Sequence, residues 1–205
     1  MSRSPCLAVE RVVIAALLTL LGACSTVEPV PSSPKATPVA PGPAPAAASA
    51  ARSEAIQTET GSRMNTEQAA TMLAEHNRVR QEVGVPPLSW SAEVARFQQA
   101  WLDKLAAGSC GLQHNPRRSN YGENLFIGTR GYFGPVEAAR SWEEEKRVYR
   151  GEAINDRNYI KVGHYTQMVW RETRELGCGI AQCRDSVIIG CNYSPPGNFT
   201  GRKPY

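Results

Sequence analysis

Residues 163–170 read Gly-His-Tyr-Thr-Gln-Met-Val-Trp, and the hydrophobic pattern of the chain changes at this segment. Residues 165–170 predict a short helix, which His164 could cap. Downstream, residues 186–191 read Ser-Val-Ile-Ile-Gly-Cys, a compact β-branched run, and a second short apolar run precedes it. Asp185 lies between the two runs, where it can turn the chain. The sequence therefore predicts an antiparallel hairpin near the C-terminus.

The chain upstream of this segment predicts three helices and one further strand. Apolar residues recur at helical spacing in three stretches, residues 66–83, 91–108 and 135–148. Asn65 and Gln68 can form a capping box at the start of the first helix, and Pro135 is a favourable first-turn residue for the third helix. Residues 124–127 (Asn-Leu-Phe-Ile) predict a strand. Helices around a small antiparallel sheet define an α+β layered domain.

Residues 1–23 predict an export signal. Basic residues precede an apolar run at residues 12–21, which is shorter than the roughly 20 residues that a membrane-spanning helix needs. The run ends in Leu-Gly-Ala-Cys-Ser, which resembles a bacterial lipobox with Cys24 as the acylated residue. A plain secretory signal with an incidental cysteine is the alternative. Ser25 after the cysteine resembles lipoproteins that are sent to the outer membrane, so we expect a lipid-anchored envelope protein.

Residues 24–64 predict a lipidated cysteine followed by a flexible linker. Their prolines lie among alanine, serine and threonine: Pro29, Pro31, Pro34, Pro38, Pro41, Pro43 and Pro45. Such a segment buries too little apolar surface to offset the entropy of ordering it. Residues 65–205 remain, enough for one domain with a single core.

The charge of the chain excludes one class of partner. With 23 basic and 19 acidic residues the net charge is only +4, and the two signs are interspersed. A nucleic-acid surface needs a basic stripe, so we expect no nucleic-acid partner. We expect a monomer.

The four cysteines of the domain predict disulfides: Cys110, Cys178, Cys183 and Cys191. An even number of cysteines in an exported domain favours disulfides over free thiols. Three pairings are compatible with the sequence. A four-thiolate zinc site is the alternative, but Cys178 and Cys183 lack the two-residue spacing of zinc knuckles.

Four motifs resemble the CAP family, which includes plant pathogenesis-related 1 proteins and cysteine-rich secretory proteins. They are residues 76–80 (His-Asn-Arg-Val-Arg), 122–125 (Gly-Glu-Asn-Leu), 163–170, and 191–199 (Cys-Asn-Tyr-Ser-Pro-Pro-Gly-Asn-Phe). They occur in the family's order, and the resemblance extends over nearly the whole of residues 66–205. The resemblance implies a three-layer α-β-α sandwich, with helices on both faces of a three- or four-stranded antiparallel sheet.

The resemblance also selects one disulfide pairing, Cys110 with Cys183 and Cys178 with Cys191. Plant members have a further cysteine pair just before the Gly-His-Tyr motif. Residues 154–162 contain no cysteine, so we expect the loop before His164 to be less braced than in plant members.

Members of the family share a cleft lined by two histidines and two acidic residues, which the resemblance places at His114, Glu123, Glu145 and His164. Glu143 and Glu144 are the alternatives to Glu145 if the alignment shifts by one or two residues. Neutral imidazoles beside carboxylates suit a divalent cation such as Zn²⁺. The sequence thus gives a candidate metal site at these four residues.

Each of these residues also has a structural interpretation. Glu123 can hold the backbone of its own turn, and His164 can cap a helix. His76 lies among apolar residues on a helix face, so we expect it to be a hydrogen-bonded core histidine.

Three functions are compatible with this sequence. The first is a non-catalytic binding module at the envelope, for a lipid, a sterol or another extracellular ligand. The second is a metal-assisted hydrolase that uses Glu123 or Glu145 as general base. The third is release of residues 195–205 as a signalling peptide, because this tail resembles the peptide released from plant members.

Overall fold

The computed structural model describes residues 59–118 and 120–205. The predicted signal peptide (residues 1–23), the lipidated Cys24 and residues 25–58 of the predicted linker lie outside the described residues. Among the residues that are described, no helix is long and apolar enough to cross a membrane.

The predicted helices are present, with one difference at the end of the third. The elements in chain order are α2 (Thr66–Glu82), β1 (Ser89–Trp90), α3 (Ala92–Ala107), β2 (Gly122–Thr129), α4 (Pro135–Glu143), the 3₁₀ helix η1 (Glu144–Arg147), α5 (Tyr159–Met168), β3 (Glu175–Cys183) and β4 (Ser186–Ser194). Asn65 and Gln68 form the predicted capping box at the start of α2. The third helix tightens to 3₁₀ geometry after Glu143, a common way for a helix to end.

The four strands form one mixed sheet in the order β1-β3-β4-β2. β3 and β4 form the predicted antiparallel hairpin, with Cys183 opposite Ser186, and β2 pairs antiparallel with the other edge of β4. The expectation of a wholly antiparallel sheet was wrong at one edge, because β1 pairs in parallel with β3. β1 has two residues and lies between α2 and α3. The two helices therefore set its direction, whereas a hairpin connection would have made it antiparallel to its neighbour.

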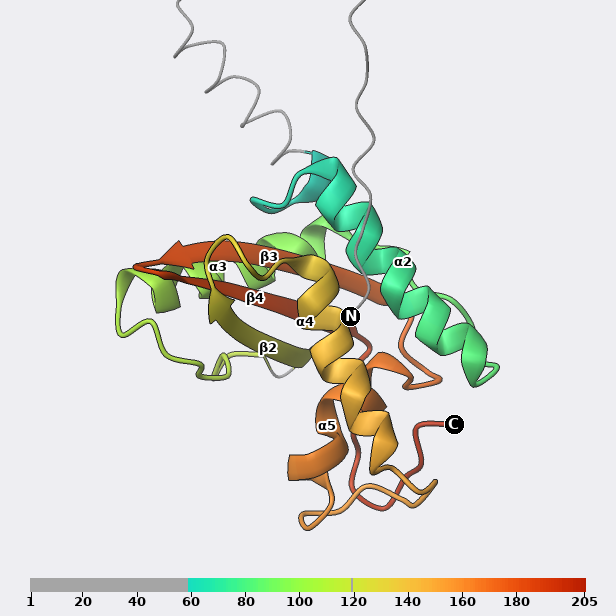
Figure 1. Cartoon of the computed structure of the whole chain (residues 1–205). Coiled ribbons are helices and arrows are strands. Elements are labelled where there is room, and N and C mark those ends of the chain that lie inside the picture. The colour runs from blue at the N-terminus through green and yellow to red at the C-terminus, as the bar shows by residue number, and fades with distance from the viewer. Residues whose placement is uncertain (1–58, 119) are drawn as a thin grey trace, which may run out of the picture. The chain divides into compact units, whose positions relative to one another are not determined.

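Helices cover both faces of the sheet, as Figure 1 shows, and the predicted α-β-α sandwich is confirmed. α3 packs on one face over a small core, formed by Leu102, Leu105, Leu125, Ala181, Cys183 and Ile188. α2, α4 and α5 lie on the other side, over the larger core that contains Trp142 and Trp170. α3 lies so close to β3 that a Cβ atom on Gly177 would be 2.1 Å from the backbone nitrogen of Ala95.

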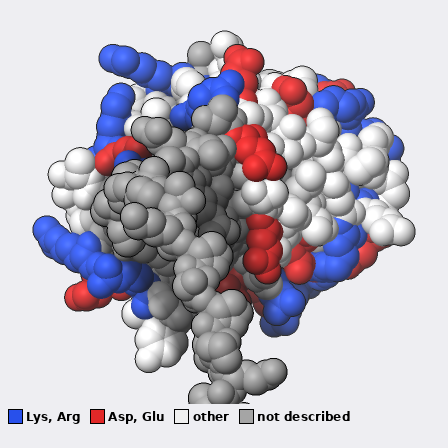
Figure 2. Space-filling model, turned by 90° about the horizontal axis from the view of Figure 1, so that it is seen from above, with Lys and Arg blue, Asp and Glu red and all other residues white. Residues whose placement is uncertain are grey.

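The surface carries both signs of charge. On the face shown in Figure 2, Lys and Arg side chains are interspersed with Asp and Glu side chains. The ion pairs include a connected group that links α2 to α4 and η1, formed by Glu75, Arg78, Glu82, Glu143 and Lys146.

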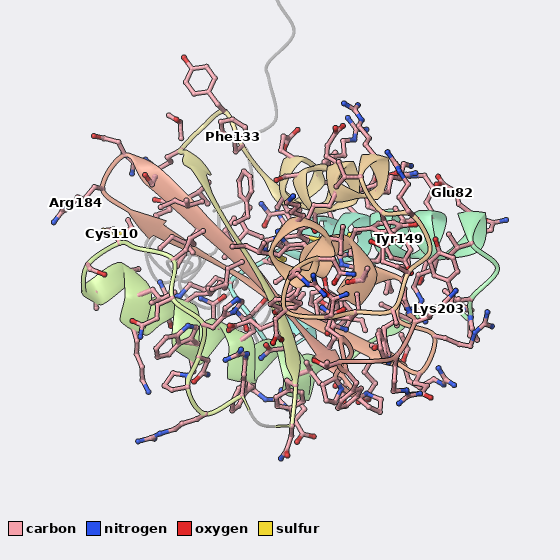
Figure 3. All side chains as sticks on the ribbon, turned by 90° about the horizontal axis from the view of Figure 1, so that it is seen from below. Glu82, Cys110, Phe133, Tyr149, Arg184 and Lys203 are labelled. Atoms are coloured by element: carbon pink, nitrogen blue, oxygen red, sulfur yellow. A yellow bond between two sulfur atoms is a disulfide. The ribbon has the colours of Figure 1, made fainter. Side chains whose placement is uncertain are left out.

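Both disulfides that the family resemblance implies are formed. Cys110 is joined to Cys183 across 73 residues, which ties the loop after α3 to the hairpin turn. Figure 3 shows Cys110 and Arg184 at the same end of the domain, opposite Glu82 and Lys203. The second bond joins Cys178 to Cys191, which face each other on β3 and β4.

The loop before His164 is held by hydrogen bonds where plant members have cysteines. The Ile154 N–H donates to the carbonyl of Arg202 (2.9 Å), and the Gly201 N–H donates to the carbonyl of Ile154 (2.8 Å). Asn155 and Asn158 then turn the chain into α5. The expected helix at residues 165–170 therefore begins earlier, at Tyr159, and His164 lies inside α5 instead of capping it.

The packed domain begins before Asn65. Met64 is fully buried in the larger core, and Thr60 and Ser62 are also buried. The indole N–H of Trp90 donates to the carbonyl of Thr60 (2.9 Å). The sequence assigned residues 59–64 to the linker, but they are part of the fold. The buried side chain of Met64 packs in the core, and hydrogen bonds join Thr60 to Trp90 of β1 and Arg63 to Gln99 of α3.

A buried chain of hydrogen bonds connects α2 to the sheet and to α5. The Nδ1–H of His76 donates to the carbonyl of Met72 (2.8 Å), so its Nε2 accepts from the Tyr193 hydroxyl (2.8 Å). Asn124 Nδ2 donates to the same hydroxyl (2.9 Å) and to the carbonyl of His164 (3.0 Å). His76 is fully buried, and burial lowers its pKa from 6.5 to about 4. His76 is the core histidine that the sequence predicts.

The domain should lose stability as the pH falls from 7 to 5. Native His76 stays neutral down to about pH 4, whereas the unfolded histidine takes up a proton near pH 6.5. The unfolded chain binds more protons between these values, so the free energy of unfolding falls by about 2 kcal/mol from this group alone. Urea unfolding at both pH values checks this, with His76→Gln as the control. An equal pH dependence in the two proteins would contradict the assignment.

Candidate functional site

Glu123 and His114 form the first half of the candidate site. Glu123 follows Gly122 at the start of β2, and its side chain is fully buried. Its Oε2 accepts from His114 Nδ1 (2.6 Å) and from the backbone N–H of Asn115 (3.0 Å). The side chain of His114 is 40% exposed. The buried carboxylate therefore fixes the imidazole, whose other edge remains open.

Glu145 and His164 repeat this arrangement on the other side. Oε1 of Glu145 accepts from His164 Nδ1 (2.7 Å). Its Oε2 accepts from the backbone N–H groups of His164 (2.8 Å) and Tyr165 (3.0 Å). The ring of Trp142 stacks beside the imidazole of His164, with centroids 6.3 Å apart. Glu145 thus orients His164 and attaches η1 to α5.

The two neighbouring glutamates have other partners. Burial raises the pKa of Glu143, but its hydrogen-bonded ion pairs with Arg78 and Lys146 together outweigh this effect and lower the pKa below its usual value. Glu144 is exposed and pairs only with Arg147 among the described residues. The structure therefore places Glu145, and neither of its competitors, beside His164.

Three of the four predicted site residues line one cavity of about 170 Å³, whose walls are His114, Glu123, Asn124, Tyr159, Ile160, Gly163 and His164. Glu145 is the fourth, and it supports His164 without lining the cavity. Both imidazoles use Nδ1 to bind a carboxylate, so Nε2 is the ring nitrogen that is left for a ligand. This tautomer and orientation are the ones that carboxylates impose on metal-binding histidines.

The donor set fits a divalent transition-metal cation with few protein ligands. Among residues 59–118 and 120–205, no group of three or more His, Cys, Asp or Glu side chains is close enough to hold a metal. His114 and His164 would therefore be the direct ligands, Glu123 and Glu145 would orient them, and water would complete the coordination. A structural zinc site uses four protein ligands, so we expect weaker binding here.

Several residues of the site were not found from the sequence. Asn124 lines the cavity and also holds the carbonyl of His164, although it belongs to the recognised Gly-Glu-Asn motif. Strand alternation argued against Asn124 as a neighbour of Glu123 in the site, because successive side chains of a strand point to opposite faces. Tyr159 and Ile160, which also line the cavity, carried no signal in the sequence. Ile160 is 82% exposed, which is unusual for an isoleucine beside a polar cavity.

The site and the fold together define a class of protein: a disulfide-braced α-β-α domain with two carboxylate-oriented histidines on one cleft. The family model described as "Cysteine-rich secretory protein family" (CAP) matches residues 73–193, more than half of the chain. The chain belongs to this family. The family and the two disulfides together indicate an extracellular domain.

The chain is similar to plant pathogenesis-related proteins. It is 39% identical to pathogenesis-related protein 1A of Nicotiana tabacum over 134 residues. The matched region covers 65% of this chain and 78% of the relative. It is 44% identical to pathogenesis-related protein PRMS of Zea mays over 137 residues. The matched region covers 65% of this chain and 80% of the relative.

Solved structures show the same fold. BmVAL-1 is 26% identical, with a TM-score of 0.63 over 71% of this chain and 84% of that one. A structure of NaASP2 with Zn²⁺ is 24% identical, with a TM-score of 0.61 over 69% of this chain and 86% of that one. At this identity the likeness to NaASP2 supports the fold alone.

Replacing Glu145 with alanine should destabilise the domain by about 2 kcal/mol, because three hydrogen bonds to a partly buried carboxylate are lost. Glu144→Ala is the matched control, since this exposed neighbour pairs only with Arg147 among the described residues; a surface ion pair of this kind contributes roughly 0–1 kcal/mol. Urea unfolding of both variants measures the difference. Equal losses of stability would show that Glu145 has no special structural role.

Proposed function

We propose that this protein is a non-catalytic binding module, anchored to the bacterial envelope through Cys24, whose cleft binds a divalent cation such as Zn²⁺ through His114 and His164. One observation carries the proposal. Two imidazoles from distant segments face one cavity, and each has its Nδ1 engaged by a glutamate. That arrangement leaves both Nε2 atoms available to the same small ligand.

The size of the cavity supports a small ligand. Pockets for drug-sized molecules run from about 300 to 1,000 Å³, whereas this cavity measures about 170 Å³. A lipid or sterol would have to bind elsewhere. The groove beside the C-terminal half of α2 is large enough, with a volume of about 550 Å³, and it is lined by Ala74, Asn77, Arg78, Gln81, Gly84, Val85 and Pro87.

A hydrolase is the second candidate, and the contacts of the glutamates favour it less. A general base needs an oxygen within reach of the water that it deprotonates. Both oxygens of Glu145 already accept hydrogen bonds, and so does Oε2 of Glu123. Oε1 of Glu123 is buried. The four domain cysteines are all in disulfides and supply no thiol nucleophile.

Release of residues 195–205 as a peptide is the third candidate. This tail contributes to the fold: Pro204 is buried, and its carbonyl accepts from the N–H of Arg171 (2.8 Å). Asn198 Nδ2 donates to the carbonyl of Gly163 (2.7 Å), and the Gly197 N–H donates to Gln167. Release would break these contacts beside α5, so a structural role of the tail is favoured.

Zinc titration of the purified, oxidised protein by calorimetry tests the proposed function. We expect saturable binding that weakens at least tenfold in His114→Ala and in His164→Ala, and that vanishes in the double variant. Glu144→Ala should bind like the parent. If the parent gives no binding heat, the cation site is wrong. If the zinc-loaded parent hydrolyses peptides or esters and the double variant does not, the protein is an enzyme.

A further inference from the structure

Three polar side chains buried between α3 and the sheet have atoms with no hydrogen-bond partner. In the part of the chain that the structure describes, the fully buried side-chain atoms of this kind are Gln98 Nε2 and Oε1, Asn192 Nδ2 and Oδ1, and Glu123 Oε1. Gln98 and Asn192 are both fully buried. All five buried atoms without a hydrogen-bond partner therefore belong to three residues, and one of these, Glu123, is in the candidate site.

The sheet register brings the three residues to one place. Glu123 on β2 is directly opposite Asn192 on β4, so both side chains point to the same face of the sheet. Leu125 and Gly190, two residues along, form the next pair on this face, and Leu125 belongs to the core under α3. Gln98 of α3 lies over Gly190, since a Cβ atom there would be 2.2 Å from Gln98 Nε2.

The spacing suits a bridging water better than direct contact. Gln98 lies over Gly190, which is two residues, or roughly 7 Å, along β4 from Asn192. Neither amide has a hydrogen-bond partner within the described part of the chain, so a water between them would satisfy both. Each buried polar group without a partner costs about 1–3 kcal/mol. Buried waters occur where about three such groups converge. Two amides and a carboxylate oxygen supply both donors and acceptors for one.

We infer that Gln98 and Asn192 are positioning residues, which hold Oε1 of Glu123 through an ordered internal water and thereby fix the orientation of His114. The first link is the water between the amides and Oε1. The second link is Oε2 of the same carboxylate, which accepts from His114 Nδ1. The consequence for cation binding rests on the proposed function, whereas the water and the orientation of His114 do not.

His164 provides an internal reference for this inference. Its partner Glu145 lies on η1 and contacts α5, and none of its hydrogen bonds involves Gln98 or Asn192. A change in the polar cluster should therefore affect His114 and leave His164 unchanged. A general loosening of the fold would affect both histidines.

The test replaces each amide by an apolar side chain of similar size, Gln98→Met and Asn192→Leu, with the exposed Gln81→Met as control. Ring ¹⁵N shifts at pH 8 report the tautomer of each histidine in the metal-free protein. In the parent we expect Nδ1–H at both histidines. In both cluster variants we expect His114 to become a mixture of tautomers while His164 keeps Nδ1–H. An unchanged His114 would overturn the inference.

The urea midpoint provides a second test, which depends on the sign of the change. A dry, unsatisfied amide destabilises the native state, so its removal would raise the midpoint. An amide that holds an ordered water stabilises the native state, so we expect Gln98→Met to lower the urea midpoint. A rise would overturn the inference, even if Asn192→Leu failed to fold. Gln81→Met should leave the midpoint unchanged.

Zinc titration of the same variants separates this inference from the proposed function. Residues that orient metal ligands typically change affinity 10- to 100-fold, and we expect a loss of this size in Gln98→Met. If the parent binds zinc and the variant binds it equally well, the positioning role is wrong. If the parent binds no zinc, the proposed function fails, and the tautomers still decide whether Gln98 and Asn192 position His114.

Discussion

A buried chain of hydrogen bonds through His76, Tyr193 and Asn124 holds the helices against the sheet. It joins α2, β4, β2 and α5 at one point of the larger core. Each polar group in it needs its partner, because an unsatisfied group at this depth costs more free energy than the bond itself contributes. The chain therefore permits one relative placement of the helices and the sheet. The carbonyl of His164 is its last acceptor, so the chain also fixes one wall of the cleft.

Arg80 provides a second fixed point between α2 and the segment after α5. Its guanidinium is fully buried and donates to four carbonyls, those of Pro86, Met168, Trp170 and Thr173. Burial lowers its pKa to about 10, so the group remains charged at neutral pH. A planar group with five donors suits such a cage of carbonyls, and lysine could not replace it. The first and last residues of the His-Asn-Arg-Val-Arg motif, His76 and Arg80, thus both stabilise the fold through buried hydrogen bonds.

The candidate site follows from this frame. β2 carries Glu123, and the 3₁₀ turn after α4 carries Glu145, so the two carboxylates belong to elements on different sides of the cleft. Each holds one histidine by Nδ1, and both imidazoles face the same cavity. The proposed binding surface is therefore formed by the second nitrogens of two rings, while most of the polar contacts orient these rings. The buried amides of Gln98 and Asn192 lie on the same face of the sheet as Glu123, and we infer that they hold its second oxygen through a water.

Local structure was predictable from the chain alone, since the capping box at Asn65, the hairpin turn at Asp185 and the helix start at Pro135 depend only on neighbouring residues. The family motifs added the sandwich, the disulfide pairing and the four site positions. The placement of Glu145 beside His164, the packing of residues 59–64 into the core and the parallel pairing of β1 were visible in the three-dimensional structure alone. The same holds for Asn192 opposite Glu123 and for Gln98 over Gly190. These features depend on contacts between segments tens of residues apart, and local propensity and periodicity carry no information about such contacts.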